Sequence, residues 1–543
     1  MTAETTGTYT PNKAGVASTQ RHRSLGVLIA ISIFWFALNF HWAALLTILV
    51  PSQVTGLLFH AAPGATLVDR KAWVDAHVEI TQALVEAPGL IVALIANPLF
   101  GLFSDRTPGR LGRRRPYILG GTALNVVGLV LMALAPLAFV QQGSGSIVGP
   151  SILVLTGALM LTQLANNAAA APFHALLPDM VPEAQRGKAS GIMGLALFLG
   201  QIGGAVAPIL FGFDSSKLLA GGQAPAIFDH GIVLAYFAVA GVIALMALLT
   251  LLTVREDPWR RMVEAAAQRI ENRRMGRDLS VTVLVVVVVS AGMIALFNSS
   301  LGGAGVNGDS FNVVELVAVL LASYGAARAF DFRPRRNPDF SWVVVTRMLV
   351  MMGVYTVQNF IEQYMRKVAI PNSGGDAFVP SPEAATTLFI VILTVTALIS
   401  TLLAGWGSDR IGRKRMVYIS GGFMAVVGAA FVVAPYLVPG HVLTLAFGAA
   451  AVFGIGYGAY VSVDWALVAD VLPSEKTFAR DMGVWNIGLT APQVIALVFG
   501  SWLVALGTAI SGATLGYTFL FVWLVVFCIL GTVTVRNIKG VNG

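Results

Sequence analysis

Among the charged side chains inside long apolar runs of this 543-residue sequence, Glu86, Arg347 and Asp464 are the three candidates for ion coupling. A charge in such a run is costly unless it is paired or neutralised, and a carboxylate can be neutralised by a proton. Arg347 and Asp464 each lie about six residues from the same predicted face, hence at similar depth. We expect them to pair, either exchanging partners with a proton or statically locking two helices. Glu86, beside Pro88 and Gly89, is a second candidate proton acceptor. It could instead form a hydrogen bond at a helix kink or place a charge in an outer vestibule.

A second group of polar side chains, at mid-depth in two other apolar runs, offers hydrogen bonds instead of charge. These candidate binding residues are Asn39, His41, Trp42, Gln163, Asn166 and Asn167. Amides and aromatic rings, including nearby Trp35, suit the hydrogen bonding and stacking that a hydroxylated solute needs. The same side chains could instead join neighbouring helices, and the sequence leaves both interpretations open.

Enzyme, metal and redox chemistry find no support in the sequence. The seven histidines include no pair at helical metal-ligand spacing, and no nucleophile elbow occurs. A single cysteine, Cys528, excludes an intrachain disulfide and a thiolate cluster. No phosphate-binding Gly-Lys-Ser/Thr loop is present, which argues against ATP-driven work. We therefore expect neither a cofactor nor a metal.

The elements that must position these residues are membrane-spanning helices. Hydrophobic residues make up 56% of the chain and charged residues 11%, and the mean hydropathy is +0.77. Apolar runs of about twenty residues indicate helices, because only helices or closed barrels satisfy backbone polar groups in lipid. The sequence predicts an all-α protein of about 14 transmembrane helices, divided into a tail (1–24), an N-terminal six-helix half (25–254), a linker (255–279), an inserted helix pair (280–330) and a C-terminal six-helix half (331–543).

The basic residues orient these helices. With the N-terminus placed inside, 29 of the 35 lysines and arginines fall in cytoplasmic segments, five fall outside, and Arg347 lies within a span. The net charge of +8 therefore reflects membrane topology and not nucleic-acid binding. Both termini are predicted to be cytoplasmic, with membrane lipids as partners.

Two basic stretches repeat each other: "GLFSDRTPGRLGRRRPYILGG" (101–121) and "GWGSDRIGRKRMVYISGG" (405–422). They align once 107–110 are removed, and each closes one span and opens the next. A weaker echo links "LLPDMVP" (176–182) with "LVADVLP" (467–473). The chain is therefore predicted to consist of two six-helix halves in the same orientation.

The doubled pattern resembles the signature loop of the major facilitator superfamily. Its glycines permit close helix approach, its aspartates can face a neighbouring helix N-terminus, and its arginines can hold headgroups or cytoplasmic acids. These residues would then form a gate on the cytoplasmic side, although basic turns that serve topology and helix caps are alternative explanations. The candidate gate residues are Gly101, Asp105, Arg106, Arg113, Asp179, Gly405, Asp409, Arg410, Arg413 and Asp470.

Within the superfamily, residues 104–121, 337–355 and 463–473 resemble bacterial relatives of the sucrose and glycoside:cation symporters. The resemblance implies a cavity lined by the first and fourth helices of each half. It also implies that a sugar or glycoside crosses the plasma membrane with a proton or other cation. The Gly-Pro step typical of drug exporters is absent from 191–208, which favours uptake. Export of drug-like or metabolite substrates, or a non-transporting sensor with the same fold, remain the alternatives.

Overall fold

The computed structural model describes residues 23–64, 66–107, 111–138, 149–181, 183–210, 230–254, 274–289, 308–329, 332–374, 382–471 and 478–539. Its elements within these ranges are helical. The N-terminal group comprises α1 (Leu25–Ala44), the π-helical turn η1 (Leu45–Leu49), α2 (Val50–Ala61), α3 (Leu67–Arg106), α4 (Arg115–Leu134), the 3-10 turn η2 (Ala135–Leu137), α5 (Pro150–Met180), α6 (Glu183–Leu210) and α8 (His230–Thr253).

The remaining helices follow in the second part of the chain. They are a helix at 274–289, α10 (Gly308–Ala329), α11 (Pro338–Tyr364), the π-helical turn η3 (Met365–Ala369), α12 (Pro382–Ile411), α13 (Arg413–Leu437), α14 (Val442–Val471), α15 (Phe478–Thr534) and the 3-10 turn η5 (Val535–Asn537). The first core helix of each group thus continues into a π-helical turn.

Eleven helices of the described ranges are long and apolar enough to cross a membrane. The last of them, Asp481–Asn537, holds two helices, because α15 breaks at Ser511 and Gly512. Gly512 has a φ of +81°, a left-handed conformation that glycine adopts without strain. The 274–289 helix and α10 add an inserted pair. The all-α architecture is confirmed, and the described helices are compatible with the predicted fourteen.

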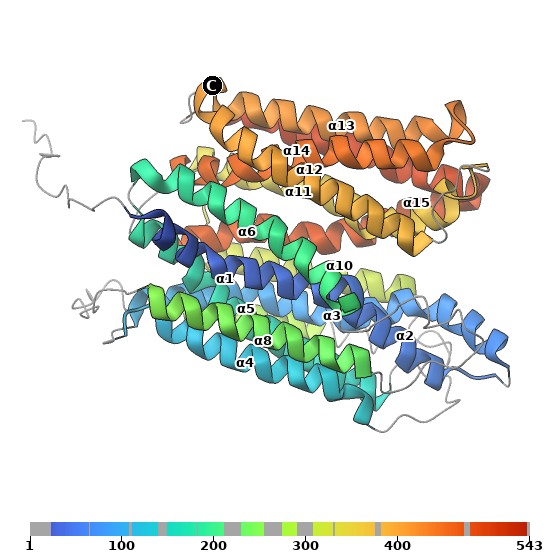
Figure 1. Cartoon of the computed structure of the whole chain (residues 1–543), viewed down its shortest axis with the longest axis horizontal. Coiled ribbons are helices and arrows are strands. Elements are labelled where there is room, and N and C mark those ends of the chain that lie inside the picture. Colours follow the sequence, from blue (N-terminus) through green and yellow to red (C-terminus); the bar gives the residue numbers. More distant parts are fainter. Residues whose placement is uncertain are drawn as a thin grey trace, which may run out of the picture.

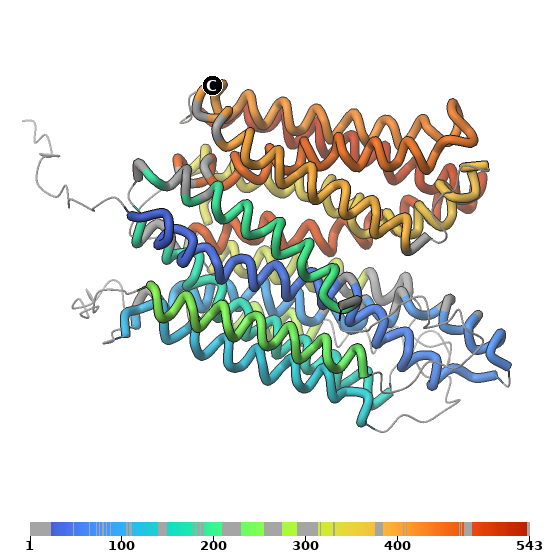
Figure 2. The backbone as a smooth tube through the Cα atoms, viewed as in Figure 1, coloured from blue at the N-terminus to red at the C-terminus, as the bar shows by residue number. Residues whose placement is uncertain are grey.

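Figure 1 shows the helices in two bundles, one containing α1, α4, α5 and α8 and the other containing α11 to α14. Each bundle has its own hydrophobic core, one built from α1 to α8 and the other chiefly from α11 to α15. The tube in Figure 2 shows the helices of both bundles running in nearly the same direction. A separate core for each half allows each to move as a unit.

Glycines set the closest helix approaches in both halves. A side chain at Gly204 would overlap the Phe40 carbonyl oxygen, and one at Gly458 would overlap that of Ala397. The first contact joins α6 to α1 and the second joins α14 to α12. Small residues at these positions let the helix backbones meet, which is how helices pack tightly without a hydrophobic driving force from water.

The inserted pair lies along the boundary between the halves. Val286 of the 274–289 helix and Ala318, Val319 and Ala322 of α10 share a small core with Leu94 of α3 and with Ala491, Val494 and Val498 of α15. Because α3 belongs to the N-terminal group and α15 to the C-terminal one, this pair touches both halves. We call the boundary between the two halves the seam.

Candidate functional site

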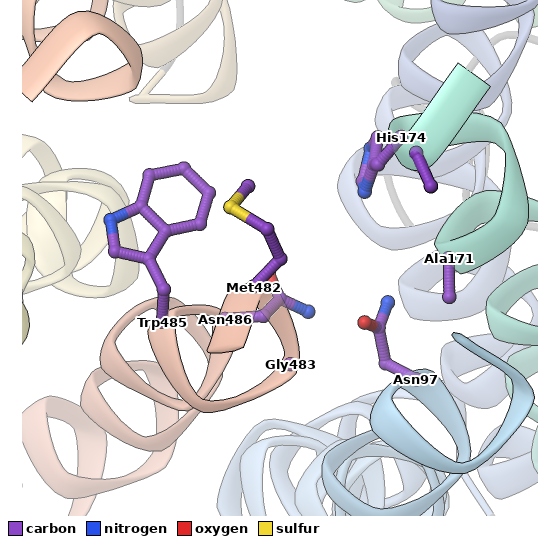
Figure 3. Close-up of a pocket in the computed structure, with 8 residues that line it drawn as sticks. Asn97, Ala171, His174, Met482, Gly483, Trp485 and Asn486 are labelled. Atoms are coloured by element: carbon purple, nitrogen blue, oxygen red, sulfur yellow. The ribbon is translucent and has the colours of Figure 1, made fainter. Parts of the chain in front are cut away.

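A small cavity opens at the seam between α3, α5 and α15. Its lining residues are Asn97, Ala171, His174, Ala175, Met482, Gly483, Trp485 and Asn486. In Figure 3, Trp485, Met482 and Asn486 of α15 form one wall, and His174 of α5 and Asn97 of α3 face them. The helices α15 and α3 approach closely at one edge of the cavity, because a side chain at Gly483 would come within 2.5 Å of Pro98. The cavity therefore presents amides, an imidazole and an indole from both halves.

A line of aromatic rings crosses the seam beside this cavity. The His174 ring lies 4.7 Å from that of Trp35 and 5.6 Å from that of Trp465, in edge-to-face geometry with both. The Trp465 ring in turn lies 4.7 Å from that of Trp485. Edge-to-face contacts at these distances are favourable. A histidine of the N-terminal half is thus held between tryptophans of both halves, and its Nε2 atom is buried without a hydrogen-bond partner in the described structure.

A second small cavity lies beside Trp35 and Trp465 of this line. It is lined by residues of α1, α6 and α14: Trp35, Met193, Gly194, Leu197, Val461, Ser462 and Trp465. His174 lines the first cavity and Trp465 lines the second, and their rings are in edge-to-face contact. The two cavities therefore have neighbouring walls at the seam.

The aromatic line ends at a buried ion pair. The Arg347 guanidinium of α11 donates to the Asp464 carboxylate of α14, and the Tyr460 hydroxyl donates to the same carboxylate at 3.2 Å. The guanidinium carbon of Arg347 also lies 3.4 Å from the centre of the Trp485 ring, a cation–π contact. Both charged side chains are about 95% buried, with exposures of 5% and 4%. The pair that the sequence predicts is therefore formed, and it touches the wall of the first cavity through Trp485.

A family model of the Major Facilitator Superfamily matches residues 80–477 and 343–541. The chain belongs to the major facilitator superfamily. This identifies it as a membrane transporter and not an enzyme. The superfamily resemblance inferred from the two signature loops is confirmed.

The chain is similar to several curated superfamily members over short segments. Sucrose transport protein SUC3 of Arabidopsis thaliana is 25% identical over 194 residues, which cover 34% of this chain and 29% of the relative. The general alpha-glucoside permease of Schizosaccharomyces pombe is 27% identical over 135 residues, covering 24% and 23%. The chain thus spans less than a third of the length of these relatives.

The fold also matches solved structures over nearly the whole chain. The proton:xylose symporter XylE of E. coli, bound to 6-bromo-6-deoxy-D-glucose, aligns with a TM-score of 0.56 and 16% identity, covering 93% of this chain and 95% of that one. At this identity the likeness concerns the fold alone.

Three of the predicted binding residues in this superfamily member face their own half. The Asn39 amide donates to the Trp35 carbonyl oxygen at 2.8 Å, within α1. His41 is fully buried, and its ring packs edge-to-face on half-buried Trp42, 4.5 Å away. These residues line neither of the two cavities described above. Their role in solute binding stays a prediction.

The amides of α5 are divided between helix contacts and the first cavity. Gln163 packs on Gly89, where a side chain would come within 2.9 Å of its Cγ. The Asn97 side-chain amide, which lines the cavity, donates to the side-chain oxygen Oδ1 of Asn167 at 3.0 Å. The Asn167 side-chain amide in turn donates to the Gln163 backbone carbonyl oxygen at 2.8 Å. Asn167 therefore orients a cavity residue without lining the cavity itself. Asn166 is buried, and its side-chain oxygen Oδ1 has no hydrogen-bond partner among the described residues.

Glu86 lies apart from the ion pair. Its carboxylate accepts a hydrogen bond from Gln82, one turn earlier in α3, at 2.9 Å. Glu86 shares a helix face with Leu90 and Leu94, which pack against the inserted pair and α15. The structure thus places this candidate at the seam, well separated along α3 from Asn97.

The candidate gate is described most fully in the C-terminal half. Arg413, at the start of α13, pairs with Asp470, near the end of α14. The equivalent residues of the N-terminal half are Arg113, which is half-buried, and Asp179, whose side chain lies outside the described structure. The side chains of Asp105, Arg106 and Asp409 also lie outside the described structure, whereas Arg410 is exposed.

The two signature loops share further local geometry. Ser104 donates to the Gly101 carbonyl oxygen at 2.8 Å, and Ser408 donates to that of Gly405 at 3.0 Å. Gly112 and Gly412, matched in the sequence repeat, have φ values of +88° and +99°, which other residues adopt only with strain. The sequence repeat is therefore a structural repeat as well.

Sequence reasoning did not select His174, Trp485, Asn97 or Asn486. His174 follows an alanine-rich segment near the end of α5, and Trp485 follows a charged loop, so each resembles an ordinary interfacial residue. A usable signal lay in Trp465, adjacent to the selected Asp464. The position of an indole beside a predicted buried charge is a reason to consider it as part of the same site.

Proposed function

We propose that this transporter takes up a sugar or glycoside together with a proton or other cation across the plasma membrane by alternating access. The first cavity supports this proposal, because it presents Asn97, His174, Trp485 and Asn486 from both halves. Amides and imidazole can bond hydroxyl groups, and an indole can stack on the apolar face of a sugar ring. A solute held between the halves is the geometry that rocking transporters require.

The names of the relatives point to the same class of solute. The sucrose transport protein and the alpha-glucoside permease are named for glycosides, and the fold neighbour is a proton:xylose symporter with a glucose derivative bound. The sugar assignment for this chain draws on these names together with the chemistry of the cavity.

One observation carries the coupling part of the proposal: Arg347 contacts both Asp464 and the cavity wall. While Asp464 is ionised, it holds the guanidinium over the Trp485 ring. A proton on Asp464 removes this attraction and releases Arg347, which uncovers the indole. Solute bound against Trp485 and a proton bound at Asp464 then influence each other, as coupled transport requires.

The gate contacts complete the proposed cycle. Arg413 and Asp470 join the ends of α13 and α14 on the face that the basic residues predict to be cytoplasmic. Their release opens the cavity towards the cytoplasm, and the inserted pair slides along the seam as the halves rock. Both termini lie on the cytoplasmic side in this scheme.

Uptake into reconstituted vesicles tests the proposal. Purified protein is tested against labelled sucrose, maltose, an aryl glucoside, xylose and a cationic amphiphile, with and without an inward proton gradient. We expect a glycoside to accumulate only with the gradient, or with a sodium gradient if sodium is the coupling ion. Gradient-driven movement of the amphiphile alone would instead indicate a drug exporter, and movement of none of the solutes would reject the sugar assignment.

A pair of variants connects the assay to the cavity. Trp485→Leu removes the indole that Arg347 covers, whereas Trp523→Leu removes an indole that contacts Phe499 and Phe527 away from both cavities. We expect the first variant to weaken solute binding and the second to leave it unchanged. Equal behaviour of the two variants would contradict the site.

A further inference from the structure

Several polar atoms inside the N-terminal half are buried and have no hydrogen-bond partner in the described structure, and six of them lie away from the seam, near the middle of the bundle. They belong to four side chains: both ring nitrogens of His41, the Thr122 hydroxyl, both amide atoms of Asn125, and the Asn166 carbonyl oxygen. His41 and Asn125 are fully buried, Thr122 is 5% exposed and Asn166 is 6% exposed. A buried polar atom without a partner is destabilising, and most such atoms in native proteins are satisfied.

The helix register places His41 and Asn166 at the same depth. The rings of Phe34 in α1 and Phe173 in α5 meet at 5.2 Å. The two helices run in opposite directions through the N-terminal bundle. His41 follows Phe34 by two helical turns and Asn166 precedes Phe173 by two turns, so both lie the same distance beyond this contact.

The contacts of α4 with α5 place the other two side chains at this level. A side chain at Gly121 would overlap the backbone of Ala165 and Ala169, and one at Gly128 would overlap Thr162. Asn125 lies between these two contact points on the same face of α4. Asn125 is therefore opposite the turn of α5 that carries Asn166.

The helix faces that carry the four side chains turn towards the interior of the bundle, and all four side chains are buried. Asn166 lies on α5 between the face that meets α4 and the face that meets α3 through Gln163. Thr122 and Asn125 lie on the same side of Gly121 around the axis of α4. His41 shares its face of α1 with Phe34, which contacts α5. These directions converge on the interior of the N-terminal bundle, in which α5 contacts both α1 and α4.

Water is the ligand that fits this group of side chains. A neutral imidazole presents one donor and one acceptor, an amide presents both, and a hydroxyl presents both. A buried water typically makes about three hydrogen bonds to such groups. A metal or sodium ion fits less well, because the group contains no carboxylate and an uncompensated charge in the membrane interior is costly.

We infer that His41, Thr122, Asn125 and Asn166 form an internal water-binding site in the N-terminal half, separate from both seam cavities. The bound water joins α1 to α4 and α5 at mid-membrane, where direct side-chain bonds between these residues are absent from the described structure. This inference does not depend on the identity of the transported solute.

X-ray hydroxyl-radical footprinting of the intact protein in nanodiscs tests for the water. The radiation generates radicals from bound water, and these modify adjacent reactive side chains. We expect rapid modification of His41. Phe389 and Phe431 of the C-terminal half, which are buried to a similar extent as His41, serve as dry controls. Modification of His41 no faster than that of the controls would overturn the proposal.

Apolar replacements provide a second, independent readout. Asn125→Leu and Thr122→Val remove water ligands with little change in shape. In a hydrated site both variants should lower the melting temperature by several degrees and slow the modification of His41 severalfold. In a dry site the same changes remove unsatisfied atoms, so the melting temperature should rise.

Gln53→Leu provides the matched control for these replacements. Gln53 is buried and bonded to the Met132 carbonyl oxygen and the Tyr236 hydroxyl, each at 2.8 Å. Its loss should lower the melting temperature without changing the modification rate of His41. Rapid modification of His41 that persists unchanged in Asn125→Leu and Thr122→Val would place the water elsewhere and reject this site. If either variant fails to fold, the other still decides the question.

Discussion

In the C-terminal half, the buried polar centre is the ion pair of Arg347 and Asp464, whereas in the N-terminal half it consists of His41, Asn125 and Asn166. The two halves share a repeated signature loop and the use of glycines at close helix contacts. They differ in what their interiors can bind. A charge pair changes its interactions when a proton arrives, but a neutral cluster mainly exchanges hydrogen bonds. The ion coupling that we propose therefore falls to the C-terminal half.

The largest expected effect comes from breaking the ion pair. Asp464→Asn or Arg347→Gln leaves one buried charge without its partner, which typically costs about 3 to 5 kcal/mol of stability. Both single variants should fold poorly and lose coupled transport, as measured by fluorescence-detected size exclusion and vesicle uptake. The double variant should recover folding, and it should exchange solute without concentrating it.

An exposed ion pair between the end of α11 and η3 provides the control. Arg366 donates to Glu362 at 2.9 Å, and both side chains are more than 40% exposed. Arg366→Gln should change stability by less than about 1 kcal/mol, because solvent-exposed pairs contribute little. Additive damage in the Asp464 and Arg347 double variant would mean that these two side chains are not coupled. Full accumulation by the double variant would move the coupling role to Glu86.

The next effect concerns packing, in which the two halves should behave alike. Gly204→Ala and Gly458→Ala each force a methyl group against a backbone carbonyl oxygen. Overpacking of this kind typically costs about 1 to 3 kcal/mol. Both melting temperatures in detergent should therefore fall by several degrees.

Glycines in open positions test whether the close contact is the cause. A methyl group added at Gly157 or Gly448 would meet no atom within 4 Å beyond the backbone of its own helix. Alanine there should be neutral or stabilising by up to about 1 kcal/mol, since alanine favours a helix over glycine. A loss at these positions equal to that at Gly204 would show that the close contacts are not what the substitutions disturb.

The smallest expected effect is at the gate. Arg413→Gln breaks the pair with Asp470, whose partly exposed side chains should contribute about 0.2 to 1 kcal/mol. Solute binding should stay within a small factor while the transport rate falls, as measured by isothermal titration and vesicle flux. Arg113→Gln should have the same effect if the gate is symmetric. Parallel loss of binding and transport would argue against a gate at this position.

The ion pair shows what could be predicted from a single sequence. Arg347 and Asp464 are separated by 117 residues, yet the cost of burying either charge alone made a pairing expected. Their similar depth followed from the fixed rise of a helix. The superfamily membership likewise followed from two copies of one local loop, since that loop carries its signature within a few residues.

His174 and Trp485 show what could not be predicted. Each is a single residue in a helix with no local signal that distinguishes it from interfacial residues. Their importance arises from rings that come from different halves and meet at the seam. The position of α10 between α3 and α15 is of the same kind, because hydropathy locates a span but not its neighbours.

The sequence by itself determined that the chain crosses the membrane repeatedly, that it contains two related halves, and that its buried charges must find partners. These properties depend on transfer free energies and on the helix repeat, which are local quantities. Tertiary structure alone decided that Arg347 also contacts Trp485, that the His174 ring lies between tryptophans of both halves, and that four neutral polar side chains are buried without partners in the described part of one half. Those arrangements depend on how helices rotate about their own axes, and packing against several neighbours sets that rotation.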